Sequence, residues 1–231
     1  MAMAGHSLGE YSALVCSNAL DFRTAVDLVR YRALVMQQAV PKGQGAMAAI
    51  LGLDDGQVET ACREAEQGEV VEAVNFNAPG QVVIAGQTTA VQRAIERAKS
   101  AGAKRALLLP VSAPFHCALM APAQERMAQD LGTLPFRDLA VPLACNVDAR
   151  LVRSAADVRD GLVRQVSGAV RWQESVELLV REGVSTFVEI GPGTVLSGLV
   201  KKIHRDARVL NVEDPQSLEE TAAALAGGGQ A

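Results

Sequence analysis

The sequence predicts a mixed α/β fold in which a larger domain carries a smaller inserted one, and three observations lead to this prediction. Strand-like and helix-like segments alternate along the 231 residues, whose 49% hydrophobic content includes only 3% aromatics. A glycine–x–serine–x–glycine turn at residues 5–9 precedes a helical pattern, as at a strand-to-helix junction. Residues 45–110 read strand, helix, strand, strand, helix and strand, which is the order of a ferredoxin-like unit.

Length, charge and cysteine content narrow the functional classes. A chain of this length can bury a full core. The net charge of −4 gives no general attraction for nucleic acid, and no apolar run reaches membrane-spanning length, so we expect neither a nucleic-acid nor a membrane partner. The four cysteines are scattered without a C-x-x-C pair, and the chain has only three histidines. We therefore expect a cytoplasmic protein with reduced thiols and no metal site.

The turn Gly5-His6-Ser7-Leu8-Gly9 is typical of a nucleophile elbow, which presents a serine at the edge of a sheet. Glycines on either side of a strained serine let the strand and the helix pass closely, because they carry no Cβ. Tyr11, Leu14 and Val15 are spaced so that a following helix packs against the sheet. In such an elbow the backbone N–H of Leu8 would donate to an oxyanion. The alternative is a glycine-rich turn without a chemical role.

Asp21 is a good N-cap for a helix that we expect to run to about Ala39. Arg32 lies inside the apolar arc of this helix, although an unpaired buried guanidinium is costly. The guanidinium is expected to snorkel to solvent, to form a structural ion pair or, because the elbow is near, to bind an anionic ligand. The apolar arc is predicted to contain Phe22, Ala25, Val26, Leu28, Val29, Ala33, Val35, Met36 and Ala39.

A proline- and glycine-rich stretch at 41–45 separates this helix from the inserted unit. Segments that do not belong to the unit lie on both sides of it. We therefore predict a ferredoxin-like subdomain at 45–110 and a larger domain formed by 1–44 and 111–231. Within the unit, strands are expected at 46–51, 70–75, 81–85 and 105–109, and helices at 54–66 and 89–101.

The chain returns to the larger domain through a loop at 110–116, which contains two prolines and a serine. Further helices are expected at 123–131, 155–166, 172–182, 194–203 and 218–225, and strands at 141–147, 186–190 and 209–212. The turn Gly191-Pro192-Gly193 could hold a phosphate, but it lacks a Walker lysine and a dinucleotide spacing, which favours a structural turn. The glycines at 227–229 predict a frayed tail.

Ser7 needs a base before it can act as a nucleophile. His116 is the only plausible base, because His6 is fixed on the elbow itself and His204 lies among basic residues near a helix end. A hydrogen-bonded structural histidine is the alternative for His116. A catalytic triad would also need an acid that orients the histidine, and no aspartate stands out for this role. Asp148 is only a positional candidate, and a backbone carbonyl could orient the histidine instead.

Five motifs occur in order along the chain: residues 5–14 (GHSLGEYSAL), 75–86 (NFNAPGQVVIAG), 112–116 (SAPFH), 163–165 (VRQ) and 189–193 (EIGPG). Together with the helix that carries Arg32, they resemble the malonyl-CoA:acyl carrier protein transacylase family over nearly the whole chain. The resemblance implies an α/β-hydrolase-like large domain with the inserted ferredoxin-like subdomain. It also implies transfer of malonyl from malonyl-CoA to acyl carrier protein in fatty acid biosynthesis, with no cofactor; we expect a monomer.

The resemblance also implies roles for individual residues. Ser7 would carry the malonyl group as an ester, and His116 would act as general base and then as general acid. Arg32 would bind the free malonyl carboxylate through a bidentate pair. The backbone carbonyl of Gln165 would hold His116.

The resemblance further bears on selectivity and on the partner protein. Phe115 and Leu8 fit a malonyl group better than a branched extender unit. Acyl carrier proteins are acidic, so a basic patch is expected despite the net negative charge, with ordinary solvated side chains as the alternative. The candidates for contact with coenzyme A or the carrier protein are Lys104, Arg105, Lys201 and Lys202.

One departure from the family is the absence of an N-terminal segment whose Gly- and Gln-bearing motif supplies a second oxyanion donor. Residues 1–4 are also too few for a full strand before the elbow, so we expect that a preceding segment is missing. Loss of one oxyanion donor typically costs about 10²–10³ in rate. A chain that begins at Met1 is therefore expected to be unstable or nearly inactive. The alternatives are a serine esterase, an acyltransferase domain of a polyketide synthase, and an inactive truncated remnant.

Overall fold

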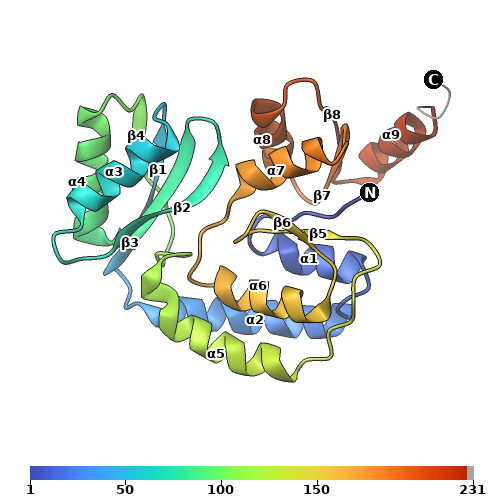
Figure 1. Cartoon of the computed structure of the whole chain (residues 1–231), viewed down its shortest axis with the longest axis horizontal. Helices are drawn as coiled ribbons and strands as arrows, with labels where there is room; N and C mark the ends of the chain where they lie inside the picture. The colour runs from blue at the N-terminus through green and yellow to red at the C-terminus, as the bar shows by residue number, and fades with distance from the viewer. Residues whose placement is uncertain (228–231) are drawn as a thin grey trace. The chain divides into compact units, whose positions relative to one another are not determined.

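The computed structural model describes residues 1–227 and has a mixed α/β architecture (Figure 1). Residues 228–231, which include two glycines of the predicted frayed tail, lie outside the described residues. The chain divides into two compact units, Met1–Ser175 and Val176–Ala231. No helix in the described part of the chain is both long and apolar enough to cross a membrane.

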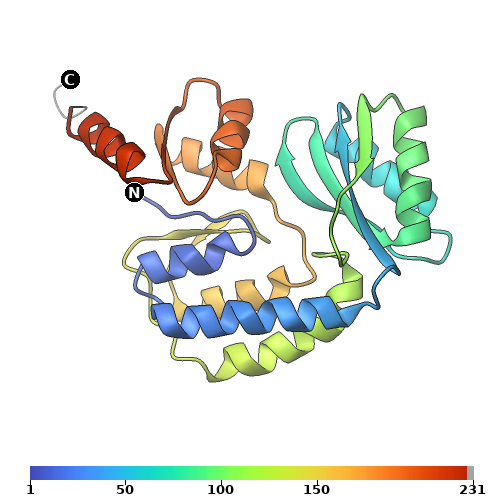
Figure 2. The ribbon, with the colours of Figure 1, turned by 180° about the vertical axis from the view of Figure 1, so that it is seen from behind.

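The segment predicted as an inserted unit has the expected element order. It consists of β1 (Gly45–Leu51), α3 (Asp55–Ala65), β2 (Val71–Ala78), β3 (Gln81–Gln87), α4 (Thr88–Ser100) and β4 (Arg105–Leu108). The strands form one sheet in the order β2-β3-β1-β4, and every adjacent pair is antiparallel. Helices α3 and α4 pack together on one face of this sheet (Figure 2), where their apolar sides and alternate strand residues form a core.

Strand β2 is longer than the sequence predicts, because irregular register lets it continue beyond Asn75. Pairing shifts twice along it, between Ala73 and Asn75 and between Phe76 and Ala78. Its outer edge also pairs with the segment after α6: Val170 N–H donates to Val74 O at 2.8 Å, and Phe76 N–H donates to Val170 O at 3.0 Å. This bridge connects the inserted sheet to the rest of residues 1–175.

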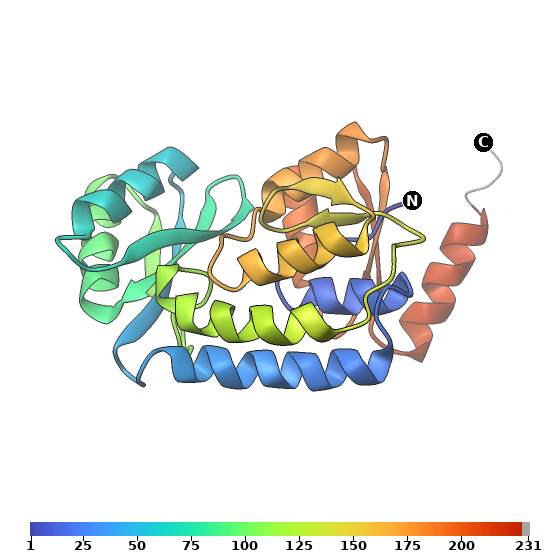
Figure 3. The ribbon, with the colours of Figure 1, turned by 60° about the horizontal axis from the view of Figure 1, so that its bottom comes forward.

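The remaining elements of the first unit are mainly helical. They are α1 (Gly9–Cys16), α2 (Phe22–Ala39), η1 (Ala118–Met120), α5 (Ala121–Thr133), β5 (Leu143–Cys145), β6 (Arg150–Val152), α6 (Ala155–Gln165) and the first turn of α7 (Trp172–Arg181). Helices α2, α5 and α6 lie side by side (Figure 3) around a core that includes Leu14, Met36, Met127 and Leu162. Met3 adds a single parallel bridge to Leu143 of β5.

The strand predicted at 141–147 is wrong in extent, and strand β6 is missing from the prediction. The structure has a short antiparallel hairpin in which Leu143–Cys145 pairs with Arg150–Val152. The connecting turn places Ala149 at φ +46°. Alanine rarely adopts this left-handed conformation, so the sequence carries no turn signal at that position.

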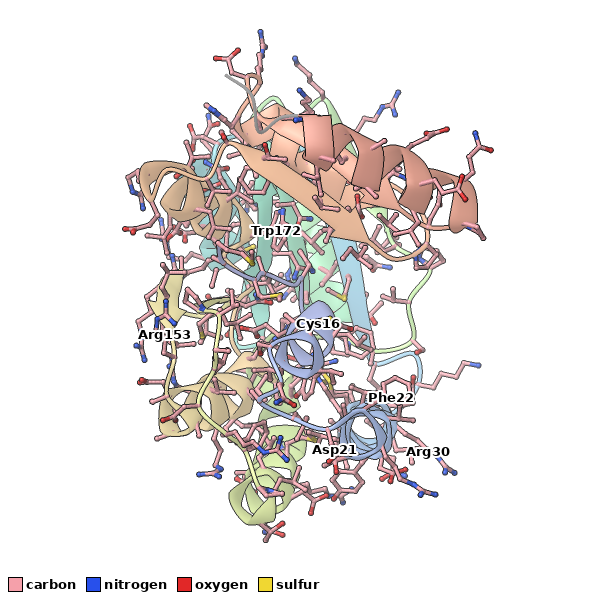
Figure 4. All side chains as sticks on the ribbon, turned by 90° about the vertical axis from the view of Figure 1, so that its right-hand side faces the viewer. Cys16, Asp21, Phe22, Arg30, Arg153 and Trp172 are labelled. Atoms are coloured by element: carbon pink, nitrogen blue, oxygen red, sulfur yellow. The ribbon has the colours of Figure 1, made fainter. Side chains whose placement is uncertain are left out.

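The buried face of α2 differs from the predicted arc. Ala25, Leu28, Val35 and Met36 are buried together with Arg32, whereas Phe22 is 73% exposed and Val26 and Ala33 are also exposed. The helix packs against α1 and α5 on one side only, so the far edge of a broad apolar arc stays in solvent. Figure 4 shows Phe22 and Arg30 on this outer side. The side chain of Asp21 caps the helix, as predicted, by accepting from Thr24 N–H at 3.0 Å.

The second unit contains β7 (Thr186–Ile190), α8 (Val195–Ile203), β8 (Arg208–Val212) and α9 (Pro215–Ala226). Strands β7 and β8 are parallel. The Glu189 carboxylate accepts from the N–H groups of Leu196 and Ser197 at 3.0 and 2.7 Å, at the start of α8. A side-chain anion therefore already occupies this helix N-terminus, which agrees with a structural role for the Gly-Pro-Gly turn.

Candidate active site

The elbow predicted at residues 5–9 has the backbone that such a turn requires. Ser7 adopts φ +52°, and α1 begins two residues later. A Cβ on Gly5 would lie 2.0 Å from the backbone carbon and oxygen of Gly9, whereas a Cβ on Gly9 would meet nothing within 4 Å. The expectation that both glycines are sterically required is therefore wrong for Gly9, and only Gly5 allows the close approach.

The structure brings the Ser7 hydroxyl and the His116 imidazole into hydrogen-bond contact, with 2.7 Å between Oγ and Nε2. His116 Nδ1 donates to the backbone carbonyl of Gln165 at 2.8 Å. That contact fixes the tautomer with the proton on Nδ1, so Nε2 accepts from the serine. Asp148 is not part of the pair, because its carboxylate binds the Arg164 guanidinium at 2.7 and 2.6 Å.

Burial sets the protonation state of His116, which is 5% exposed. Desolvation, together with the nearby charge of Arg32, lowers its pKa from 6.5 to about 3. The imidazole is therefore neutral at physiological pH and can accept a proton from Ser7. Its backbone φ of +66° is uncommon for a histidine and aims the ring at the elbow.

Arg32 is 7% exposed on the buried face of α2, as its position in the apolar arc predicts. Its Nη2 donates to Ser7 Oγ at 2.9 Å and to Gln165 Oε1 at 3.1 Å, and the guanidinium carbon lies 5.6 Å from the Tyr11 ring centre. No carboxylate in residues 1–227 forms a salt bridge with it, and its buried Nε has no hydrogen-bond partner there. Among residues 1–227 the structure thus provides no ion pair for Arg32, and its burial leaves little room for the guanidinium to snorkel to solvent.

A cavity of about 380 Å³ opens onto these groups. The elbow, α2, β1, β2 and the loop before η1 form its walls, and all of these segments lie in the first unit. The lining residues are His6, Ser7, Arg32, Ala33, Met36, Gln37, Met47, Asn75, Phe115 and His116. A charged guanidinium beside the nucleophile, within otherwise largely apolar walls, is suited to a small acyl group that carries its own negative charge.

The buried side chains of Glu10, Asn146 and Gln165 form a network behind the cavity. Only Gln165 was expected at the site, and only through its backbone carbonyl. Asn146 Oδ1 accepts from Ser7 N–H at 2.7 Å, and its Nδ2 donates to Gly5 O at 2.8 Å. Gln165 Nε2 donates to Ser7 O at 3.0 Å and to a Glu10 carboxylate oxygen. The other Glu10 oxygen accepts from Asn146 N–H at 2.9 Å. These contacts hold the strained elbow on both sides.

His6 is held away from the serine. Its Nε2 lies 2.8 Å from Asn77 Oδ1 of β2, and its ring centre lies 5.7 Å from that of Trp172. Burial lowers its pKa. Asn75, in the cavity wall, and Asn77, beside His6, thus connect β2 to the site. The motif at 75–86 includes both residues, but the sequence predicts no role for either.

Three further residues of the first unit that were predicted to make contacts, Leu8, Lys104 and Arg105, do not line the cavity. Leu8 is 51% exposed, and its N–H has no hydrogen-bond partner among residues 1–227. Lys104 and Arg105 are exposed. Arg105 pairs with Leu51 of β1, and Leu51 lies four residues, or about 13 Å, along this strand from Met47 in the cavity wall. Lys201 and Lys202 belong to the second unit. Their contact with coenzyme A or a carrier protein stays a prediction.

Comparison with known proteins gives a consistent result. The family of acyl transferase domains matches residues 1–224. The malonyl CoA-acyl carrier protein transacylase of Haemophilus influenzae is 53% identical over 215 residues, which are 93% of this chain and 69% of that protein. The crystal structure of an acyl carrier protein S-malonyltransferase from Vibrio cholerae superimposes with a TM-score of 0.93 at 52% identity, covering 94% of this chain and 71% of that one. A malonyl-transacylase in complex with a type II polyketide synthase acyl carrier protein gives a TM-score of 0.95 at 50% identity, over 96% and 72% of the two chains.

Proposed function

The chain belongs to the acyl transferase family, and from that premise we propose how its residues divide the chemistry. The activity is transfer of malonyl from malonyl-CoA to the phosphopantetheine thiol of acyl carrier protein, in fatty acid biosynthesis. Ser7 is the nucleophile, His116 the general base and acid, and Arg32 the group that binds the malonyl carboxylate. The observation that carries this assignment is the convergence of the three side chains on one cavity.

In the first half-reaction, His116 Nε2 takes the Ser7 proton while Oγ attacks the thioester carbon. The new C–O bond leaves a tetrahedral oxyanion, for which the backbone N–H of Leu8 is the proposed donor, since it follows the nucleophile directly. Collapse breaks the carbon–sulfur bond. The coenzyme A sulfur leaves with the proton that His116 returns, and the malonyl group stays on Ser7 as an ester.

In the second half-reaction, His116 takes the proton of the phosphopantetheine thiol, and the thiolate attacks the ester carbon. Ser7 leaves with that proton, so the enzyme ends as it began, with the 2.7 Å contact between Ser7 Oγ and His116 Nε2 restored. The Gln165 carbonyl keeps Nδ1 protonated throughout. Transfer between two sulfurs through an oxygen ester needs neither an electron carrier nor a metal, so the proposal includes no cofactor.

Arg32 gives the site its preference for an acyl group that ends in a carboxylate. Its guanidinium can exchange the Ser7 contact for a bidentate pair with the malonyl carboxylate, and its unpartnered Nε supplies a further donor. Phe115 narrows the cavity, which disfavours a branched acyl group. The four candidate basic residues, Lys104, Arg105, Lys201 and Lys202, are proposed to contact the acidic carrier protein or the phosphates of coenzyme A.

We extend the proposal to the architecture and the state of the protein. Residues 1–44 and 111–231 form an α/β-hydrolase-like domain, and 45–110 form a ferredoxin-like subdomain, supported by the elbow and by the β2-β3-β1-β4 order. The protein acts as a cytoplasmic monomer; its four cysteines are free thiols.

Mass spectrometry tests the proposed function directly. Incubation with malonyl-CoA should give a malonyl adduct on Ser7, which phosphopantetheinylated acyl carrier protein should then remove. Ser7→Ala should give no adduct. An adduct on another residue, or malonyl transfer by Ser7→Ala, would refute the assignment of the nucleophile.

A further inference from the structure

We propose that Glu10 is a positioning residue, which fixes the donor–acceptor orientation of the Gln165 side-chain amide and through it holds Arg32 ready for the substrate carboxylate. The inference rests on the proposed function, because it assumes that Arg32 receives that carboxylate. It gives a role to a buried acid that none of the steps above uses.

Glu10 is almost entirely buried, with 1% of its surface exposed at the start of α1. Each carboxylate oxygen accepts one N–H: Oε1 accepts from the Asn146 backbone at 2.9 Å, and Oε2 accepts from the Gln165 side chain. Burial raises the pKa of Glu10 to about 7, against the opposing effects of these two hydrogen bonds and of the Arg32 charge. The two hydrogen bonds satisfy both carboxylate oxygens and so offset part of the cost of burying this acid.

Gln165 contacts all three residues to which the proposed function gives a role, His116, Ser7 and Arg32. Its backbone carbonyl accepts from His116, its Nε2 donates to Ser7 O at 3.0 Å, and its Oε1 accepts from Arg32 Nη2 at 3.1 Å. The amide can serve all these partners in one orientation only, because Arg32 is a donor and the Ser7 carbonyl is an acceptor. Glu10 and, at 3.4 Å, Asn146 Oδ1 are further acceptors on the Nε2 side, and they reinforce that orientation.

Replacing the carboxylate with an amide would break this arrangement. In Glu10→Gln one of the two oxygens becomes an NH₂ group, so either Asn146 N–H or Gln165 Nε2 faces a donor instead of an acceptor. The backbone of Asn146 cannot turn, whereas the Gln165 amide can rotate by 180°. Rotation would present an NH₂ group to Arg32 and a carbonyl to Ser7 O. Arg32 Nη2 would then lose one of the two acceptors that hold it, and the contact with Ser7 Oγ alone would not fix its position.

The test compares malonyl-CoA with acetyl-CoA, which lacks the carboxylate, as acyl donors for Glu10→Gln. We expect kcat/KM for malonyl-CoA to fall roughly 10- to 100-fold, the range for loss of a hydrogen bond to a charged group, mostly through KM. The value for acetyl-CoA should change less than about threefold. A matched control is Ser17→Ala, which removes a buried hydroxyl at the end of the same helix; within residues 1–227 this hydroxyl donates to Leu14 O alone. The control should preserve the malonyl-to-acetyl ratio.

Two further variants make the test independent of how well Glu10→Gln folds. Gln165→Met removes the amide but keeps the carbonyl that holds His116, so it should cause the same malonyl-selective loss. Adding Glu10→Gln to Gln165→Met should lower the malonyl-to-acetyl ratio no further, because no amide is left to orient.

The outcomes separate the inference from the function on which it rests. Equal losses with both donors, or an unchanged malonyl-to-acetyl ratio in Glu10→Gln and Gln165→Met, would overturn the role of Glu10 while leaving Ser7 acylation intact. Additive effects in the double variant would also overturn it. A wild-type chain that forms no malonyl adduct would refute the proposed function itself, and the inference with it.

Discussion

Two buried groups of the site, His116 and Glu10, should give the folded protein opposite dependences of stability on pH. The pKa of His116 falls from 6.5 to about 3 on folding. The unfolded chain therefore binds more protons at this residue than the folded one, and the free energy of unfolding rises with pH between about 3 and 6.5. The pKa of Glu10 rises from 4.5 to about 7. The contribution of Glu10 to the free energy of unfolding is fully present below pH 4.5 and is lost as pH rises through about 7.

The expected size follows from these pKa values. Between pH 5 and pH 7, each group changes the free energy of unfolding by about 2 kcal/mol, His116 upward and Glu10 downward. The two contributions nearly cancel in the wild type. Relative to the wild type, the free energy of unfolding of His116→Asn should therefore fall by about 2 kcal/mol from pH 5 to pH 7, and that of Glu10→Gln should rise by the same amount. Asparagine is the suitable replacement for His116 because it tolerates the φ of +66° at that position.

Urea unfolding at the two pH values measures both effects. Trp172 is the only tryptophan, is buried, and lies in the same unit as both residues, so its fluorescence reports on the right part of the chain. Ser17→Ala, which removes no titratable group, should follow the wild-type pH dependence. The reasoning is refuted if either variant keeps the wild-type dependence, or if both depart from it in the same direction.

Three further predictions concern the site and its support. Arg32→Ala should lower malonyl transfer by about 10²- to 10³-fold, which is the cost of losing a buried charge partner, and should raise transfer of uncharged acyl groups. Parallel kinetics with malonyl-CoA and acetyl-CoA check this prediction. Equal losses with the two donors would contradict it. Gly5→Ala should destabilise by at least about 3 kcal/mol or prevent folding, because its Cβ would meet the Gly9 backbone at 2.0 Å. Gly9→Ala should be neutral or stabilising by up to about 1 kcal/mol, so equal thermal shifts of the two alanine variants would be inconsistent with the elbow geometry. Asn146→Ala should cost about 2–4 kcal/mol in urea unfolding, because Ser7 N–H and Gly5 O would both lose their buried partner; a loss under 1 kcal/mol would show that neither group depends on it.

The features that the sequence predicts well are those with a local signal. The elbow is five consecutive residues, Asp21 caps the helix behind it, and Arg32 stands out because a charge interrupts an apolar arc. The inserted unit has alternating strand and helix patterns with short turns, so its element order could be predicted over residues 45–108. The contact of His116 with the Gln165 carbonyl was expected from the resemblance alone, since no spacing rule connects two residues so far apart in the chain.

The features that escape prediction depend on where separate segments meet. Which edge of the α2 arc is buried is decided by α1 and α5, which pack on one side only, and the sequence of α2 does not contain that information. Hairpin β5–β6 turns at an alanine, so no glycine marks it. Asp148 has the right position for a triad but is bound to Arg164.

The network behind the cavity shows why the reacting groups can be predicted from the sequence, whereas the residues that hold them in place cannot. A nucleophile or a base belongs to a small set of residue types and can be selected by chemistry, whereas any buried Asn, Gln or Glu can provide support. Asn146 acts only because the end of β5 meets the elbow, and Glu10 acts only because α6 brings Gln165 to α1. If these contacts set the orientation of Arg32, substrate preference depends on residues that never touch the substrate, and a malonyl-to-acetyl ratio that shifts in Glu10→Gln would show it.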